Sequence, residues 1–182
     1  MKAKRMPGSD VENEVGGLPD ILKPRLRVVF CGINPGMRSA MVGMHFANRS
    51  NRFWRVLHQS GFTPEEILPQ DSVSLLKYGY GLTSAVERPT VSAGDLRRGD
   101  FLDARASLER KIRKHRPRHL AFLGKPAYSA MFNLRQVPWG KQPMQIGATT
   151  VWVLPNPSGL NRAFTLQALV REYKKLVDAI GE

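Results

Sequence analysis

The feature that most constrains the fold of this chain is an alternation of short apolar runs with helical patterns. The apolar runs have the length of strands and are nearly continuous, which is typical of strands buried on both faces. They lie at residues 26–31, 120–123 and 149–154. Helical patterns occupy residues 51–60, 71–77, 103–116, a stretch from Pro126, and 163–180. The alternation predicts an α/β fold with a mainly parallel central sheet covered on both faces.

The remaining segments predict a single domain. Residues 81–86 have the pattern of a further short strand, and residues 87–99 that of a polar loop. No internal repeat or second domain boundary is present. Residues 1–20 mix charge, glycine and proline with little periodicity, so we expect a flexible basic tail there and one domain over 21–182.

The charge of the chain points to a polyanionic partner. Lysine and arginine number 28 against 15 acidic residues, which gives a formal net charge of +13. Nucleic acid is the first candidate for such a surface, and the alternatives are general solubility or an anionic membrane. The basic run at residues 110–116 is either a solvated helix face or a surface that attracts DNA.

Several function classes are excluded or disfavoured. The single cysteine, Cys31, cannot form an internal disulfide, a cysteine-rich zinc site or an iron–sulfur cluster, and we expect it in the core. His115 and His119 are separated by Pro117 and are not expected to share a helical face as metal ligands. No apolar stretch is long enough to span a membrane, and no secretory signal is seen, so we expect a cytoplasmic protein.

Two unusual turns follow the first and the last predicted strand. The first is Gly-Ile-Asn-Pro-Gly at residues 32–36, and the second is Pro-Asn-Pro-Ser-Gly-Leu-Asn-Arg at residues 155–162. In open α/β sheets, ligands bind beyond the carboxyl ends of the strands. The two turns are therefore expected to form two sides of one site.

Four motifs in order give the chain a family resemblance. "VVFCGINPG", "NRFW", "WGKQ" and "WVLPNPSGLNR" together resemble the mismatch-specific uracil-DNA glycosylases, the Mug/thymine-DNA glycosylase branch of the uracil-DNA glycosylase superfamily. The resemblance runs from about Ile21 to the C-terminus. It implies a three-layer α/β/α sandwich and hydrolysis of the N-glycosidic bond of uracil in DNA, with a preference for G·U mismatches. It implies no metal or organic cofactor. The expected partner is double-stranded DNA with G·U mismatches. We expect no association with a membrane, and we expect a monomer.

The resemblance places Asn34 where the family holds its attacking water. An amide can orient a water but cannot take its proton, so we expect a slow enzyme unless a carboxylate assists. From the residues alone, a turn-former before proline is the favoured role of Asn34, and the catalytic role comes from the resemblance. Asp95, beside Gly94 in the polar loop, is the candidate assisting base, and its alternative role is a loop or helix cap.

Five residues match the family's substrate pocket. Phe46 is implied to stack on the flipped uracil, which is worth roughly 1–3 kcal/mol. Backbone groups of Ile33 and Phe46 are implied to bond the uracil edge, with help from Ser39. Gly36 leaves room for a methyl group or a larger modified base. Asn156 is implied to lie near the deoxyribose.

The tip of the second turn matches the loop that enters the duplex. Leu160 is the implied wedge for the space left by the flipped base, and its alternative is a core position. Gly159 and Asn161 are implied to read the widowed guanine, with Ser158 beside them at the tip. Arg162 is implied to support the loop or reach a phosphate.

Other functions stay open from the sequence. A non-catalytic DNA-binding α/β domain would keep the charge and the fold without the chemistry. A glycosylase for other deaminated or modified bases would use the same pocket. A basic RNA-binding protein is disfavoured because no strand carries the aromatic pattern of an RNA-recognition motif.

Overall fold

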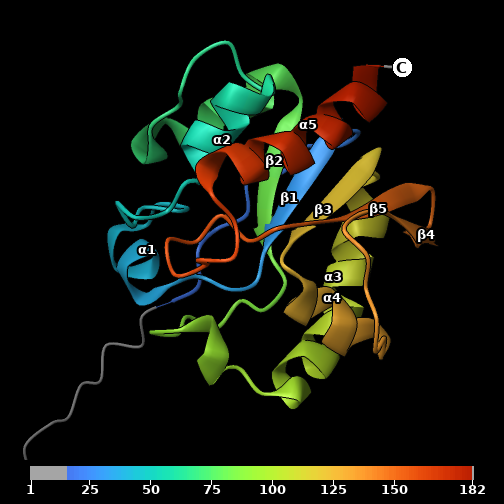
Figure 1. Ribbon diagram of the computed structural model, residues 1–182. Helices are drawn as coiled ribbons and strands as arrows, with labels where there is room; N and C mark the ends of the chain where they lie inside the picture. Colours follow the sequence, from blue (N-terminus) through green and yellow to red (C-terminus); the bar gives the residue numbers. More distant parts are fainter. Residues whose placement is uncertain (1–15, 182) are drawn as a thin grey trace, which may run out of the picture.

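The computed structural model describes residues 16–181, and its centre is a five-stranded sheet (Figure 1). The strands follow the order β2-β1-β3-β5-β4. Their bounds are β1 Val28–Gly32, β2 Tyr80–Ser84, β3 His119–Leu123, β4 Gly140–Ile146 and β5 Thr149–Leu154. All neighbours pair in parallel except β4, which lies antiparallel to β5 at the edge.

Helices cover both faces of the sheet. On one face lie α2 (Phe53–Ser60) and α5 (Leu166–Gly181), and on the other lie α3 (Arg98–His115) and α4 (Lys125–Phe132) (Figure 1). The helices α2 and α5 pack on an apolar cluster that includes Phe30 of β1. The helices α3 and α4 pack on a second cluster, which includes Val29 of the same strand. The expected three-layer α/β/α sandwich is confirmed.

The structure contains two elements that the sequence did not predict. The helix α1 (Met37–Val42) lies within the turn and loop that follow β1, and its single buried residue gives almost no apolar pattern. The strand β4 contains Pro143 and a register shift between Lys141 and Gln145. Proline is tolerated there because β4 is an edge strand, but it conceals the strand in the sequence.

The other boundaries differ by a few residues. The predicted helix at 71–77 is the 3₁₀ segment η1 (Pro69–Tyr78), and the predicted loop 87–99 contains the short 3₁₀ turn η2 (Ala93–Asp95). Cys31 is buried as expected, and burial raises the pKa of its thiol, so the thiolate is disfavoured. No helix in the described part of the chain is long and apolar enough to cross a membrane.

Residues 16–20, which the sequence assigns to the tail, contact the domain. The Asp20 carboxylate lies 2.6 Å from the Lys111 ammonium. The Pro19 carbonyl lies 2.9 Å from Nε2 of His45, and Ile21 forms an antiparallel bridge with β2. This part of the predicted tail therefore belongs to the folded domain, whereas the tail over residues 1–15 lies outside the described residues.

Candidate active site

A cavity of about 780 Å³ lies beyond the carboxyl ends of β1, β3 and β5. Its lining includes the turn 32–36, residues 90–94 and Leu96 of the loop that follows β2, and residues of the segment between Asn156 and Phe164. The two unusual turns therefore do form two sides of one cavity. They meet there because β1 and β5 both run parallel to β3 and end at the same edge of the sheet.

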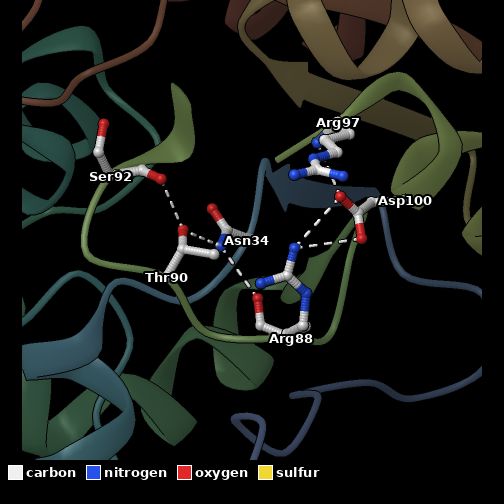
Figure 2. A network of polar contacts seen from close by, with 6 residues as sticks. All are labelled: Asn34, Arg88, Thr90, Ser92, Arg97 and Asp100. Carbon is white, nitrogen blue, oxygen red and sulfur yellow. Dashed lines mark hydrogen bonds and ion pairs between the residues drawn. The ribbon is translucent and has the colours of Figure 1, made fainter. Parts of the chain in front are cut away.

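The side chain of Asn34 is fixed in one orientation. Its Nδ2 donates to the carbonyl oxygen of Arg88 at 3.0 Å and to Oγ1 of Thr90 at 2.7 Å (Figure 2). A carbonyl oxygen only accepts, so the amide nitrogen must face Arg88. The described residues offer no hydrogen bond to Oδ1, which is left as an acceptor in a residue that lines the cavity. This orientation suits an acceptor for a water molecule.

Thr90 completes this arrangement, and sequence reasoning missed it. Its hydroxyl donates to the Ser92 carbonyl at 2.7 Å while accepting from Asn34. Its backbone pairs with the first turn, since Thr90 N–H donates to Pro35 at 3.1 Å and Met37 N–H donates to Thr90 at 3.0 Å. A threonine in a polar loop gives no signal in the sequence for such a role.

An ion pair braces the loop behind Thr90. The Arg88 guanidinium donates to both oxygens of Asp100, at 3.1 and 3.2 Å, and Asp100 also accepts the backbone N–H of Arg97 at 2.7 Å (Figure 2). The bond from the Arg97 N–H, followed by that from Arg88, lowers the pKa of the Asp100 carboxyl. Because the Arg88 carbonyl also holds Asn34, this network connects the start of α3 to the candidate catalytic amide.

Asp95 lies outside this network. Its carboxylate accepts the Ser92 N–H at 2.8 Å and forms a capping box around η2. The residue is exposed, and it is not among those that line the cavity. The geometry is that of the alternative role in the sequence analysis, a cap, and assistance to Asn34 stays a prediction.

Phe46 lines the cavity. One face of its ring stacks on Phe53, with centroids 4.0 Å apart and planes at 26°. The backbone of Phe46 has φ +52°, a left-handed conformation that is unusual for a bulky residue and is found where surroundings impose it. Next to it, the buried His45 bonds Pro19, so the N-terminal segment fixes this part of the slot.

The other predicted pocket residues also line the cavity. An added Cβ at Gly36 would meet nothing within 4 Å, so the space beside it is open. The Ser39 hydroxyl accepts the Ala47 N–H at 3.2 Å and steadies the loop around the slot. The Asn156 side chain accepts the Ser158 N–H at 2.9 Å and so shapes the second turn, while Ile33 is among the residues that line the cavity. The contacts of all these residues with a base stay predictions.

The tip of the second turn stands out from the surface. Leu160 is 80% exposed, which is unusual for a large apolar side chain and excludes the alternative of a core position. A Cβ at Gly159 would lie 2.5 Å from Cβ of Ser50, so only glycine fits there. Asn161 donates through Nδ2 to the Asn156 carbonyl at 2.8 Å, and Arg162 is exposed.

Arg52 is a second residue that sequence reasoning missed. Its guanidinium donates to four carbonyl oxygens of the segment 157–164, at distances between 2.6 and 3.2 Å. Its own backbone N–H donates to the Pro157 carbonyl at 3.0 Å. Arginine supplies a planar fork of donors that matches such a set of acceptors. Arg52 therefore connects the start of α2 to the loop that carries Leu160.

Lys125 adds a positive charge at the rim. It is the first residue of α4, lines the cavity, and places its ammonium 4.3 Å from the centre of the Trp139 ring. Among the described residues, no group of three His, Cys, Asp or Glu side chains is placed to hold a metal ion.

The fold is that of an α/β/α protein, and its candidate substrate site is the cavity at the carboxyl edge of a mainly parallel sheet. A family model for the uracil DNA glycosylase superfamily matches residues 19–178. The solution NMR structure of a proposed uracil DNA glycosylase from Methanosarcina acetivorans is similar, with a TM-score of 0.57 and 18% identity. That similarity covers 88% of this chain and 97% of the other.

The match to the family model spans nearly all of the described chain, and the protein belongs to the uracil DNA glycosylase superfamily. Membership supports the general expectations of DNA as substrate and of base excision by hydrolysis. The similarity to the Methanosarcina protein adds support for the fold.

Proposed function

We propose that this protein is a monofunctional DNA glycosylase that removes uracil, with a preference for G·U mismatches, and leaves an abasic site. The observation that carries the proposal is the pairing of a fixed amide with an exposed wedge. Asn34 has both N–H groups engaged and Oδ1 available in the cavity, while Leu160 stands exposed on the opposite lip.

In the proposed mechanism the uracil nucleotide leaves the stack and enters the cavity, because its glycosidic bond is unreachable inside the duplex. Leu160 fills the space, and backbone groups of Gly159 and Asn161, with Ser158 beside them, face the widowed guanine. Arg162 reaches a phosphate. The segment is preformed because Arg52 holds its carbonyl groups.

In the cavity the base stacks on the free face of Phe46. Backbone groups of Ile33 and Phe46, with the Ser39 hydroxyl, bond the uracil edge and stabilise the negative charge that develops on the leaving base. Asn156 lies by the deoxyribose. Asn34 orients the water that attacks the sugar carbon as the glycosidic bond breaks.

The reaction is expected to be slow. General-base help is worth roughly 10²–10⁴-fold, and an amide cannot provide it. Asp95 would have to leave its cap on Ser92 to assist. We further propose a monomer that acts in the cytoplasm without a cofactor.

A broader range of bases is a second candidate. The cavity of about 780 Å³ and the open space beside Gly36 favour entry of bases larger than uracil, including modified pyrimidines and deaminated purines. A pocket without steric exclusion discriminates a single methyl group by only about 1–3 kcal/mol.

The test is single-turnover excision on labelled oligonucleotides with G·U, A·U, G·T, G paired with a modified pyrimidine, and single-stranded uracil. Wild type should excise from G·U fastest, and Asn34→Ala should lose about 100-fold because the attacking water is no longer positioned. Asn34→Asp, which introduces a carboxylate as a possible base, should be faster than Asn34→Ala. Asp95→Ala should excise within about threefold of wild type if its carboxylate only caps η2.

Two results would contradict the proposal. Binding to DNA without excision from any substrate would favour a non-catalytic domain. Full activity in Asn34→Ala would remove the amide from the mechanism. A large loss in Asp95→Ala, with an unchanged melting temperature, would instead establish the assisting carboxylate.

A further inference from the structure

Basic residues gather at the end of the sheet opposite to the candidate active site. The last turn of α3 contains Arg113 and Lys114, and Arg116 follows as the C-cap of the helix. Arg118 precedes β3, and Arg25 precedes β1. Backbone bonds hold these segments together: the Arg25 N–H donates to His115 at 2.8 Å, and the Arg118 N–H donates to Leu26 at 2.9 Å. We call these five residues the basic end.

The basic end faces away from the cavity. It lies where β1 and β3 begin, and Figure 1 shows that these two strands run side by side in the same direction. The cavity lies where the two strands end. None of its five residues lines the cavity. A straight duplex held across the cavity mouth would therefore not reach it, and its charges are not needed for that contact.

The charges of the basic end are largely uncompensated. All five residues are exposed, and within residues 16–181 the only ion pair recorded for them joins Arg113 to Glu109 at 4.0 Å. Burial, followed by the nearby Lys141 and Arg118, lowers the pKa of His119 at the start of β3, as expected near a positive surface. Like charges gathered at one end of the sheet repel one another, and a bound polyanion would relieve the repulsion.

The chemistry of the basic end fits double-stranded DNA best. Arginine side chains suit phosphate oxygens, and four of the five residues are arginines. Single-stranded nucleic acid binding relies on exposed aromatic rings, and no aromatic residue is among the large exposed apolar side chains of the described residues. None of those side chains belongs to the basic end, so it also lacks the apolar centre of a protein interface.

We propose that the basic end binds a second segment of double-stranded DNA through its phosphates while the first segment lies at the active site. The proposal builds on the proposed function, which supplies the first segment. A protein with two duplex sites can pass directly from one segment to another through a ternary complex. Its release from DNA then becomes faster as the concentration of competing duplex rises.

The test measures release of the full-length protein from a labelled, undamaged duplex against increasing unlabelled duplex. For wild type, the release rate should rise with competitor concentration. The variant R113Q/K114Q/R116Q/R118Q should reduce the slope of that rise at least about tenfold, because it removes four phosphate contacts. The matched control R135Q/R171Q/K174Q/K175Q removes four exposed charges elsewhere and should keep the slope within about twofold.

The outcomes separate this proposal from the proposed function. G·U excision, measured in parallel, should be unchanged in the R113Q/K114Q/R116Q/R118Q variant. If wild type excises nothing, the proposed function fails, yet the release assay on undamaged duplex still reports on the basic end. If the fourfold variant has a lower melting temperature than wild type, R116Q/R118Q replaces it. The release rate of this double variant should rise with competitor concentration at a slope between those of wild type and the fourfold variant.

Three results would overturn the proposal of a second DNA site. One is a wild-type release rate that does not depend on competitor. Another is an equal loss of slope in both fourfold variants, which would indicate general charge. The third is acceleration by single-stranded RNA or polyglutamate equal to that by duplex, which would assign the basic end to another polyanion.

Discussion

At the scale of single residues, the site depends on how its amide is held. Asn34 donates both N–H groups to the loop 88–92, so its remaining acceptor cannot rotate away without breaking two bonds. The partner at Thr90 is buried, with 5% of its surface exposed, which protects its bond to Asn34 from competition by water. Preorganised groups of this kind lower the cost of ordering a nucleophile.

Thr90→Val tests this arrangement. The variant keeps the shape of the side chain but removes the acceptor, so one Asn34 N–H is left without its partner. We expect single-turnover excision from G·U to fall roughly tenfold, from the cost of about 1–3 kcal/mol for a lost buried bond. Thr90→Ser keeps the hydroxyl and should recover most of the rate. Equal rates in wild type and Thr90→Val would show that Arg88 alone holds the amide.

At the scale of elements, the wedge depends on the start of α2. The loop that carries Leu160 has no regular structure of its own, and its carbonyl oxygens point at one guanidinium. The buried Tyr173 hydroxyl of α5 donates to Pro155 at 3.1 Å and holds the base of the loop. Contacts from α5 and from the start of α2, on one face of the sheet, thus hold the loop that carries the proposed wedge.

Arg52→Lys should weaken this support, because one ammonium cannot reproduce a fork of four bonds. We expect excision from a G·U duplex to fall about tenfold, from the loss of bonds worth about 1 kcal/mol each. The loss should be smaller for uracil in an unpaired bubble, where no wedge is required. Arg55→Lys, on the same helix with its side chain at the surface, is the matched control and should change neither rate. Equal losses on both substrates would argue against a role through the wedge.

At the scale of the whole molecule, histidines make stability depend on pH. Burial is the main cause that lowers the pKa of His45, and burial together with Lys141 and Arg118 lowers that of His119. The folded state therefore binds fewer protons than the unfolded state, whose histidines titrate near 6.5. Stability is complete above that pH and declines as the pH falls below it.

The free energy of unfolding, measured with urea between pH 7.5 and 5.5, should decrease toward the acidic end. Carboxylates such as Asp100 titrate below this window and contribute little to the slope. His45→Gln, which keeps a donor for the Pro19 carbonyl, should flatten the decline. An identical decline in wild type and variant would assign the pH dependence to His119 and other groups.

The sequence predicts the architecture well because apolar runs and helical periodicity report burial directly. Residues 26–31 and 149–154 predict β1 and β5 to within two residues, and the turns after them predict where the cavity forms. By contrast, β4 is hidden by Pro143, and α1 by its lack of an apolar face.

The parts of the site that the sequence misses are those defined by contacts across the chain. Thr90 and Arg52 act through bonds to residues 56 and more than 100 positions away. No local pattern encodes such a partner. Asp95 is a case in which the local sequence permits two roles, an assisting base or a cap. The structure shows the capping geometry.

The sequence separation between Arg52 and its acceptors also affects the order in which the parts of the site form during synthesis. Its four acceptors lie 105 to 112 positions further along the chain. During synthesis, the amide-bearing turn and α2 leave the ribosome long before the wedge does, and contacts this distant in sequence form slowly. A nascent chain would thus contain Asn34, the proposed water-positioning residue, before it contains Leu160, the proposed wedge. The proposed wedge would be held in place only after residues 157–164 have been synthesised and have met Arg52.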